Sequence, residues 1–195
     1  MDKIKSALEK ALERAEELSP PTDQERLEWK WLPEGKRLAG LFIESKAEFP
    51  NELYKFDQSA QMYLVKGIVG VLVEMLRIPE NPLILKTNER ALDGLSKLIG
   101  DPFMEIAERT RYVWTQYLQF YPSQIDAASQ QLKLEVQGQL EQAVRQKTGT
   151  QGPINLGPIE AQPEFQAQLM KLATQMKEPY ETHLRDFRIE IRGLV

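Results

Sequence analysis

The chain has a single histidine, His183, and an acidic residue, Asp186, follows it three positions later. On a helix these two residues share a face, so the carboxylate can orient the imidazole for acid–base chemistry. No serine or cysteine nucleophile in a recognisable motif accompanies the pair, and no second histidine completes a metal-ligand pair. We therefore interpret His183 and Asp186 as a solvated surface pair, and we expect no catalytic residue and no metal.

A glycine-rich segment at residues 149–157 is the second candidate, because glycines that precede a helix can bind phosphate through backbone N–H groups. A P-loop ends in Gly-Lys-Ser or Gly-Lys-Thr, and a dinucleotide-binding motif follows a strand, but this segment has neither feature. Glycine and proline also suit a turn between two helices. The segment is therefore predicted to be a turn, and no cofactor is expected.

Trp29 and Trp31 flank Lys30, and residues two apart on a helix point in different directions. One indole is therefore expected to be partly exposed, near Pro33. An exposed tryptophan can anchor a protein–protein interface. The alternative is that the pair clamps the N-terminal helices onto the central helix. Trp29 and Trp31 are candidate interaction residues on the first interpretation.

Two charged segments have simpler explanations than ligand binding. The first N-terminal segment carries acidic residues interspersed with lysine and arginine, which is typical of a solvated helix face; these are Glu9, Glu13, Glu16 and Glu17. The second segment mixes basic and aromatic residues as nucleic-acid binding surfaces do: Arg109, Arg111, Tyr112, Trp114 and Tyr117. The aromatic residues there have the spacing of a helix core, so core packing is favoured.

The composition excludes several classes of function. The 195-residue chain has no cysteine, which excludes disulfides, thiolate nucleophiles and cysteine-ligated metal centres. Its formal net charge of −4 is unfavourable for general binding to nucleic acid. The most apolar stretch, residues 62–78, is interrupted by Lys66, Glu74 and Arg77, so no membrane span is expected. Residues 1–18 lack the apolar region of a signal peptide, and a cytoplasmic location is expected.

Apolar residues recur at steps of three and four through nearly the whole chain, which predicts an all-α protein. Thr22 and Glu25 form a capping-box pattern that begins a helix, and Pro33 is expected to break or kink it. Pro50 is expected to open a helix that ends near residue 78. This helix is apolar on nearly every side, which predicts the centre of a bundle, and Gly67 and Gly70 predict close helix packing.

The connection after this central helix is less regular. Residues 83–87 suit either a loop or the first turn of a helix that ends at Ile99. Gly100, followed by Asp101 and Pro102, predicts that one helix stops and another starts.

From Pro122 onward two apolar stripes of matched length, 125–144 and 165–191, are joined by the glycine-rich segment. This pattern predicts a long antiparallel helical hairpin of coiled-coil type with a turn near residues 148–160. Pro179 is expected to kink or divide the second arm. The predicted fold is a multi-helix bundle at 1–121, followed by a glutamine-rich hairpin at 122–195 that either packs on the bundle or projects from it.

Glutamine is a good helix former and carries no charge, so glutamine-rich faces suit helix–helix contacts. Gln131, Gln139 and Gln142 lie on the first arm of the predicted hairpin and are candidate interaction residues.

Three segments together resemble a family of uncharacterised bacterial helical proteins, a domain of unknown function. They are residues 3–14 at the opening of the chain, residues 35–40 with the sequence Gly-Lys-Arg-Leu-Ala-Gly, and residues 162–165 at the entry to the last helix. The resemblance extends over nearly the whole chain and implies a bacterial, cytoplasmic setting. The family carries no assigned activity, so the resemblance implies no functional residue.

Catalytic groups are scarce in this sequence, and amphipathic helix surface is plentiful. The sequence therefore favours a non-enzymatic protein. The first hypothesis is an interaction, assembly or adaptor protein that binds a protein partner. The second is a homo-oligomeric structural protein whose hairpins pair. The third is a helical bundle that binds a small ligand in an internal pocket.

Overall fold

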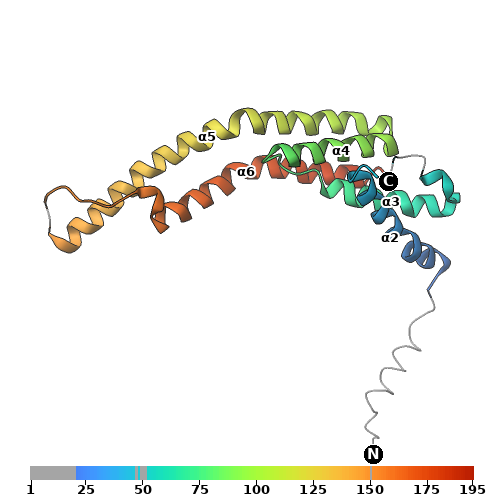
Figure 1. Ribbon diagram of the computed structural model, residues 1–195, viewed down its shortest axis with the longest axis horizontal. Helices are drawn as coiled ribbons and strands as arrows, with labels where there is room; N and C mark the ends of the chain where they lie inside the picture. The colour runs from blue at the N-terminus through green and yellow to red at the C-terminus, as the bar shows by residue number, and fades with distance from the viewer. Residues whose placement is uncertain (1–20, 47, 49–51, 150) are drawn as a thin grey trace, which may run out of the picture.

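A computed structural model of the chain describes residues 21–46, 48, 52–149 and 151–195. Within these ranges the chain forms helices and no strand, which confirms the all-α prediction (Figure 1). The long helices are α2 (Asp23–Ile43), α3 (Gln58–Glu74), α4 (Pro82–Ile99), α5 (Asp101–Thr148) and α6 (Pro163–Arg192). Two short 3-10 helices are η1 (Leu53–Lys55) and η2 (Ile159–Ala161). The acidic face predicted at residues 9–17 lies outside the described residues.

Helix α2 begins at the predicted capping box. The hydroxyl oxygen of Thr22 accepts a hydrogen bond from the backbone N–H of Glu25 at 3.2 Å. In return, the Glu25 carboxylate accepts one from the backbone N–H of Thr22 at 2.7 Å. Backbone and hydroxyl hydrogen bonds from Thr22 hold the pKa of the Glu25 carboxyl below its usual value. Two N–H groups at the helix start are thereby satisfied, as the pattern predicts.

Three prolines lie inside helices that continue past them. Pro33 was expected to break or kink a helix; it does not break α2, which includes it. Pro122 lies within α5, so the expected boundary between residues 121 and 122 falls inside a continuous 48-residue helix. Pro179 likewise does not divide α6. All three prolines are exposed, so water can bind the carbonyl that each one leaves unpaired while packing on the buried side holds the helix together.

Side-chain caps fix the starts of α3 and α4. Helix α3 starts at Gln58, where the Asp57 carboxylate accepts from the N–H of Ala60 at 2.8 Å. Pro50, where a helix was expected to open, lies outside the described residues. Residues 83–87 belong to α4, which is capped by the Asn81 side chain accepting from the N–H of Ile84 at 2.9 Å. Gly100, with a φ of 76°, separates α4 from α5 as predicted. It caps both helices, whereas Asp101 is the first residue of α5 and not its cap.

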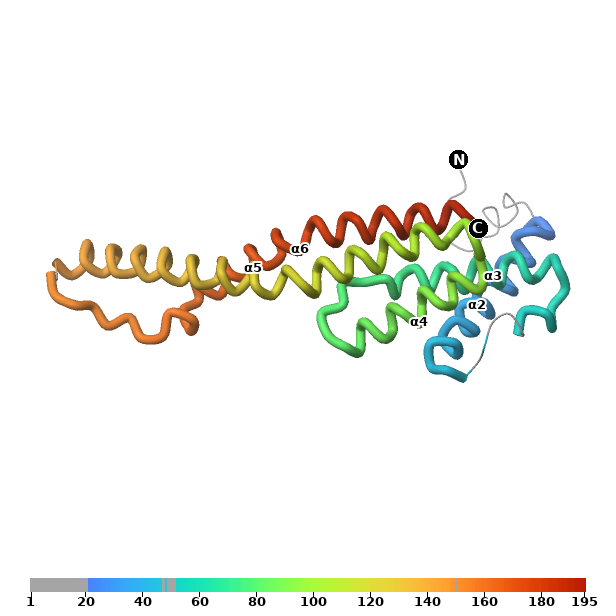
Figure 2. The backbone as a smooth tube through the Cα atoms, turned by 90° about the horizontal axis from the view of Figure 1, so that it is seen from above, coloured from blue at the N-terminus to red at the C-terminus, as the bar shows by residue number. Residues whose placement is uncertain are grey.

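Helix α3 lies at the centre of the bundle, where it contacts α2, α4 and α6. The N-terminal half of α5 and the C-terminal half of α6 complete the bundle, and the two helices then run on together beyond it, antiparallel and side by side (Figures 1 and 2). The largest fully buried side chains of this core come from all five helices: Leu38, Phe42, Leu64, Ile68, Leu72, Leu92, Leu95, Phe103, Trp114, Leu184 and Ile191.

Helices α2 and α3 cross at a pair of glycines. A Cβ atom built on Gly67 would lie 2.4 Å from the carbonyl oxygen of Leu32 and 3.1 Å from the Cα of Gly35. A Cβ on Gly35 would lie 2.3 Å from the carbonyl oxygen of Leu64. The backbones are therefore in direct contact, which only glycine permits. The close packing predicted for Gly67 is present, whereas Gly70 has nothing within 4 Å of its Cβ position.

Two arginines satisfy carbonyl groups at the ends of neighbouring helices. The guanidinium of Arg188, on α6, donates twice to the carbonyl oxygen of Leu76, just past α3, at 2.7 and 3.1 Å. Arg90, on α4, donates to the carbonyl oxygen of Phe42 in the last turn of α2, and its guanidinium lies 4.3 Å from the centroid of the Phe42 ring. Positive charge is favourable at both places, because carbonyls at helix C-termini carry partial negative charge.

Replacement of Arg188 by methionine should lower the free energy of unfolding by about 2 kcal/mol, because the buried Leu76 carbonyl loses two charge-assisted hydrogen bonds. Urea denaturation measures the change. The matched control is Arg185→Met on the same helix. Its hydrogen bond to Thr182 and its ion pair with Glu178 are local and exposed, so it should change stability by less than about 0.5 kcal/mol. Equal losses in the two variants would contradict a capping role for Arg188.

Candidate functional site

The hairpin segment that extends beyond the bundle has its own small hydrophobic cluster near its tip. The cluster consists of Leu132, Val136, Ile159 and Phe165, with half-buried leucines around it, and is distinct from the bundle core. Helix η2 contacts both α5 and α6, and the ammonium group of Lys133 pairs with Glu160. This ion pair and the tip cluster hold the two arms together at the end remote from the bundle.

The glycine-rich segment serves the connection between the arms. Gly149 ends α5 with a φ of 70°, and its N–H donates to the carbonyl oxygen of Arg145 at 2.9 Å. Gly157 has a φ of 69°, and its N–H donates to the side-chain oxygen of Asn155 at 3.0 Å. Both glycines adopt left-handed conformations that other residues rarely take. Both glycines thus allow the chain to reverse its direction between α5 and α6.

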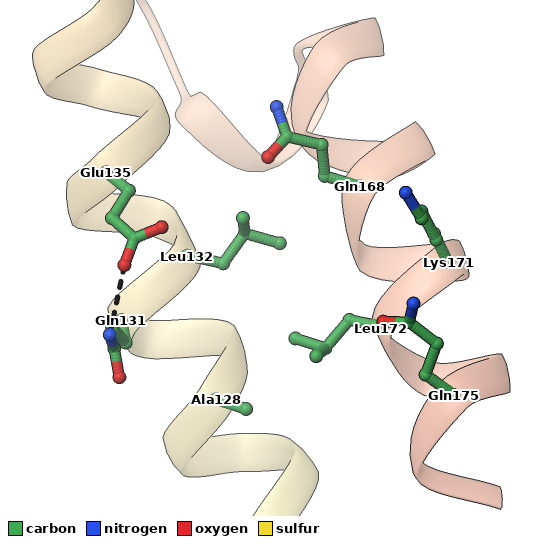
Figure 3. A pocket seen from close by; sticks show the side chains of 8 residues that line it. All are labelled: Ala128, Gln131, Leu132, Glu135, Gln168, Lys171, Leu172 and Gln175. Atoms are coloured by element: carbon green, nitrogen blue, oxygen red, sulfur yellow. Dashed lines mark hydrogen bonds between the residues drawn. The ribbon is translucent and has the colours of Figure 1, made fainter. Parts of the chain in front are cut away.

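Between the tip cluster and the bundle, small residues such as Ala128 and Ala173 face the partner arm, and an open groove lies on each side of the hairpin. We call the first the glutamine groove (Figure 3), which has a volume of about 460 Å³. Its lining residues are Ala128, Gln131, Leu132 and Glu135 on α5, and Gln168, Lys171, Leu172 and Gln175 on α6.

The glutamine groove has an apolar floor and polar rims. Leu132 and Leu172 point toward each other in its middle (Figure 3). On the α5 rim, the amide nitrogen of Gln131 donates to the Glu135 carboxylate at 3.0 Å. On the α6 rim, Lys171 is exposed, and it forms no ion pair with any residue that the structure describes. These groups can donate and accept hydrogen bonds, and the glutamines do so without net charge.

We call the groove on the opposite side the tyrosine groove, with a volume of about 620 Å³. It begins where the hairpin leaves the bundle, and its lining residues are Pro79, Glu80, Tyr117, Leu118, Tyr121, Pro122, Ile125, Asp126, Ser129, Leu169 and Ala173. The rings of Tyr117 and Tyr121 stack with centroids 4.7 Å apart, and burial raises the pKa of the Tyr117 hydroxyl. Glu80 pairs with Lys177 and, through this hydrogen bond, raises the pKa of the Lys177 ammonium.

The structure separates the five residues predicted from the sequence as an interaction surface. Gln131 lines the glutamine groove, and Gln139 and Gln142 are exposed farther along the same face of α5. Trp29 and Trp31 lie on α2, at the opposite end of the molecule from the hairpin tip (Figure 1). Trp29 is 66% exposed, whereas the half-buried Trp31 ring packs edge-on against Phe56 at 5.4 Å.

The sequence interpretation missed the groove residues of the second arm and the acidic residue of the first, namely Gln168, Lys171, Gln175 and Glu135. One signal was available. In the apolar stripe of α5, the small side chain of Ala128 stands between the larger ones of Ile125 and Leu132. A small residue inside such a stripe leaves space between paired helices.

Of the remaining candidates, only Tyr117 lines one of the two grooves, the tyrosine groove. His183 and Asp186 are both exposed, and the His183 ring stacks on the buried Phe187 with centroids 6.4 Å apart. Trp114 and Tyr117 are buried in the core, as their spacing predicts. Arg109 and Arg111 form ion pairs, with Glu190 and with Glu89 respectively.

In the described part of the chain, histidine, aspartate and glutamate side chains form no group that could hold a metal ion. Among the described helices, none combines the length and the apolar character that crossing a membrane requires.

Comparison with known proteins places the chain in a family. The model of a family of unknown function (DUF6657) matches residues 50–193. The chain belongs to this family. No curated protein and no solved structure matches it.

The DUF6657 match starts before η1 and continues almost to the end of α6, so it includes the bundle core, the hairpin and both grooves. It does not include α2, and therefore Trp29 and Trp31 lie outside it. Of the three segments on which the sequence resemblance rests, only residues 162–165 fall within the match. The DUF6657 region thus contains Gln131, Gln139 and Gln142 but neither tryptophan.

Proposed function

We propose that this DUF6657 protein is a non-enzymatic interaction, assembly or adaptor protein whose contact surface is the outer part of the α5–α6 hairpin. One observation carries the proposal. The two paired helices run on beyond the bundle and present an open groove with a leucine floor and rims rich in uncharged glutamine (Figures 2 and 3).

The apolar and polar groups of the glutamine groove differ in the free energy of burying them against a partner. The half-buried side chains of Leu172 and Ala128 gain free energy when a partner covers them, at about 25 cal/mol for each Å² of apolar surface removed from water, whereas Leu132 is only 8% exposed and adds little. Glutamine amides can exchange hydrogen bonds with water for hydrogen bonds with a partner, whereas charged rims would cost more to desolvate. The groove is therefore chemically suited to contact with another helix.

The hairpin is favoured over the tryptophan pair as the contact surface. Trp31 is engaged within its own chain, by Phe56 and by the Lys30 ammonium 4.4 Å from its ring centroid. Trp29 is exposed, but it lines neither the glutamine groove nor the tyrosine groove. The family match supports the same choice, because it includes the hairpin and not α2.

The proposal is tested by affinity purification of the full chain from its native host, with substitutions on the groove rim. The variants Gln131→Arg and Gln175→Arg should reduce recovery of a specific protein at least about tenfold, which corresponds to about 1.4 kcal/mol of binding free energy. The matched control is Gln119→Arg, at an exposed position of α5 within the bundle half.

Binding of the recovered protein is then measured by calorimetry with purified components. The proposal requires the two rim variants to bind more weakly than the Gln119→Arg control. Equal recovery with all variants would exclude the groove as the contact surface. A chain that recovers no protein and also stays monomeric would exclude the function itself.

A further inference from the structure

The two rims of the glutamine groove carry one acidic and one basic group without a charged partner. Glu135 lies on the α5 rim and is held by Gln131, an uncharged neighbour. Lys171 lies on the α6 rim and makes no ion pair within the described residues. By contrast, Lys133 pairs with Glu160 across the arms, and Lys177 pairs with Glu80 next to the bundle.

Glu135 and Lys171 lie in the same stretch of the groove, on opposite rims (Figure 3). A two-fold axis along the groove places α5 of one copy over α6 of the other. Rotation about this axis does not shift any residue along the groove. Therefore the acidic rim of each copy meets the basic rim of the other. Each pair of copies then forms the Glu135–Lys171 contact twice.

We propose that the glutamine groove is a self-association surface, on which a second copy of this chain packs its own glutamine groove in the same orientation. The hairpins of the two copies then form a four-helix arrangement with their tips at the same end. Leu132 and Leu172 of both copies form its interior, and the glutamines of the rims hydrogen-bond across it. This inference rests on the proposed function and names the partner at that site.

The charge pattern favours the glutamine groove over the tyrosine groove for this role. The lining of the tyrosine groove includes two acidic groups, Glu80 and Asp126, and no basic group. The nearby Lys177 is already paired with Glu80. Two copies that met through the tyrosine groove would bring like charges together, which is unfavourable. Of these two grooves, the glutamine groove is the one that is complementary to itself.

The first test measures the mass of the full chain in solution by sedimentation equilibrium over a range of concentrations. The unmodified chain should form dimers. Glu135→Lys and Lys171→Glu should each weaken dimerisation at least about tenfold, because like charges then face each other at both contacts. The double variant carrying both substitutions should restore it. Glu108→Lys, an exposed position of the same helix within the bundle half, is the matched control and should dimerise normally.

The second test uses the absence of cysteine from the natural chain. A single cysteine in place of Gln175 on the groove rim should be joined efficiently to its copy by a flexible bismaleimide. A cysteine in place of Gln130, an exposed residue that does not line the groove, should not. Equal cross-linking of the two variants would overturn the proposed arrangement, as would dimers unaffected by the charge reversals.

The outcomes separate this inference from the proposed function. A chain that stays monomeric at all concentrations but binds another protein through the glutamine groove would overturn self-association and leave the interaction function intact. A monomeric chain that binds no protein would overturn both. Dimers that dissociate with either charge reversal and return with the double variant support both.

Discussion

Substitution of Gly67 by alanine should destabilise the protein by about 3 kcal/mol, the cost of forcing extra volume into a tightly packed contact. The new Cβ would lie 2.4 Å from the carbonyl oxygen of Leu32, which belongs to the backbone of α2 and cannot rotate away. Helices α2 and α3 would have to separate, and the buried contacts of Leu38 and Phe42 on α2 would be disturbed. Urea or thermal denaturation measures the loss.

The matched control is Gly70→Ala, three residues later on the same helix. Nothing lies within 4 Å of a Cβ at that position, and alanine is the better helix former by about 1 kcal/mol. This variant should therefore be as stable as the unmodified chain or more stable. A neutral Gly67→Ala substitution would show that α2 does not cross α3 at the distance seen here.

Substitution of Phe165 by alanine should unfold the outer hairpin while the bundle stays folded. Phe165 is nearly fully buried in the tip cluster, and removal of such a side chain costs about 3–5 kcal/mol. Because the tip cluster is distinct from the bundle core, the loss should fall on the local stability of the tip. Hydrogen exchange should show faster exchange at residues 132–144 and 163–172, and unchanged protection in α3.

Met170→Ala is the control for this prediction, because Met170 lies on the same helix and its side chain is 75% exposed. It should leave the exchange of both regions unchanged. If Phe165→Ala lowered the protection of α3 as much as that of the hairpin tip, the protein would unfold as one cooperative unit, and the two clusters would not be independent.

The effect of three prolines on helix continuity could not be predicted from the sequence. A proline removes one backbone donor and restricts the preceding residue. Pro33 was therefore expected to break or kink a helix, Pro122 to begin a new segment, and Pro179 to kink or divide the second arm. All three lie within continuous helices on exposed faces. Whether a helix survives a proline depends on what packs against its other side, and that information lies in residues distant in the sequence.

The residues of the candidate site were predictable only in part. Gln131 was identified from the glutamine-rich composition of the first arm, and it lines the groove. Glu135 and Lys171 were not identified, because nothing in the local sequence relates a residue of α5 to one that follows it by 36 positions in α6. Their relation depends on the register of the two arms, which the tip cluster and the bundle fix together.

By itself the sequence determined the all-α class, the capping box at Thr22, the separation of two helices at Gly100 and the membership of Trp114 and Tyr117 in the core. These features depend on periodicity and on local backbone chemistry, which neighbouring residues carry. The tertiary structure decided the continuity of α5 and α6, the backbone contact of Gly35 with Gly67, and the groove between the arms. Those features arise when faces of distant helices meet, because packing, and not local propensity, sets the distance and register between them.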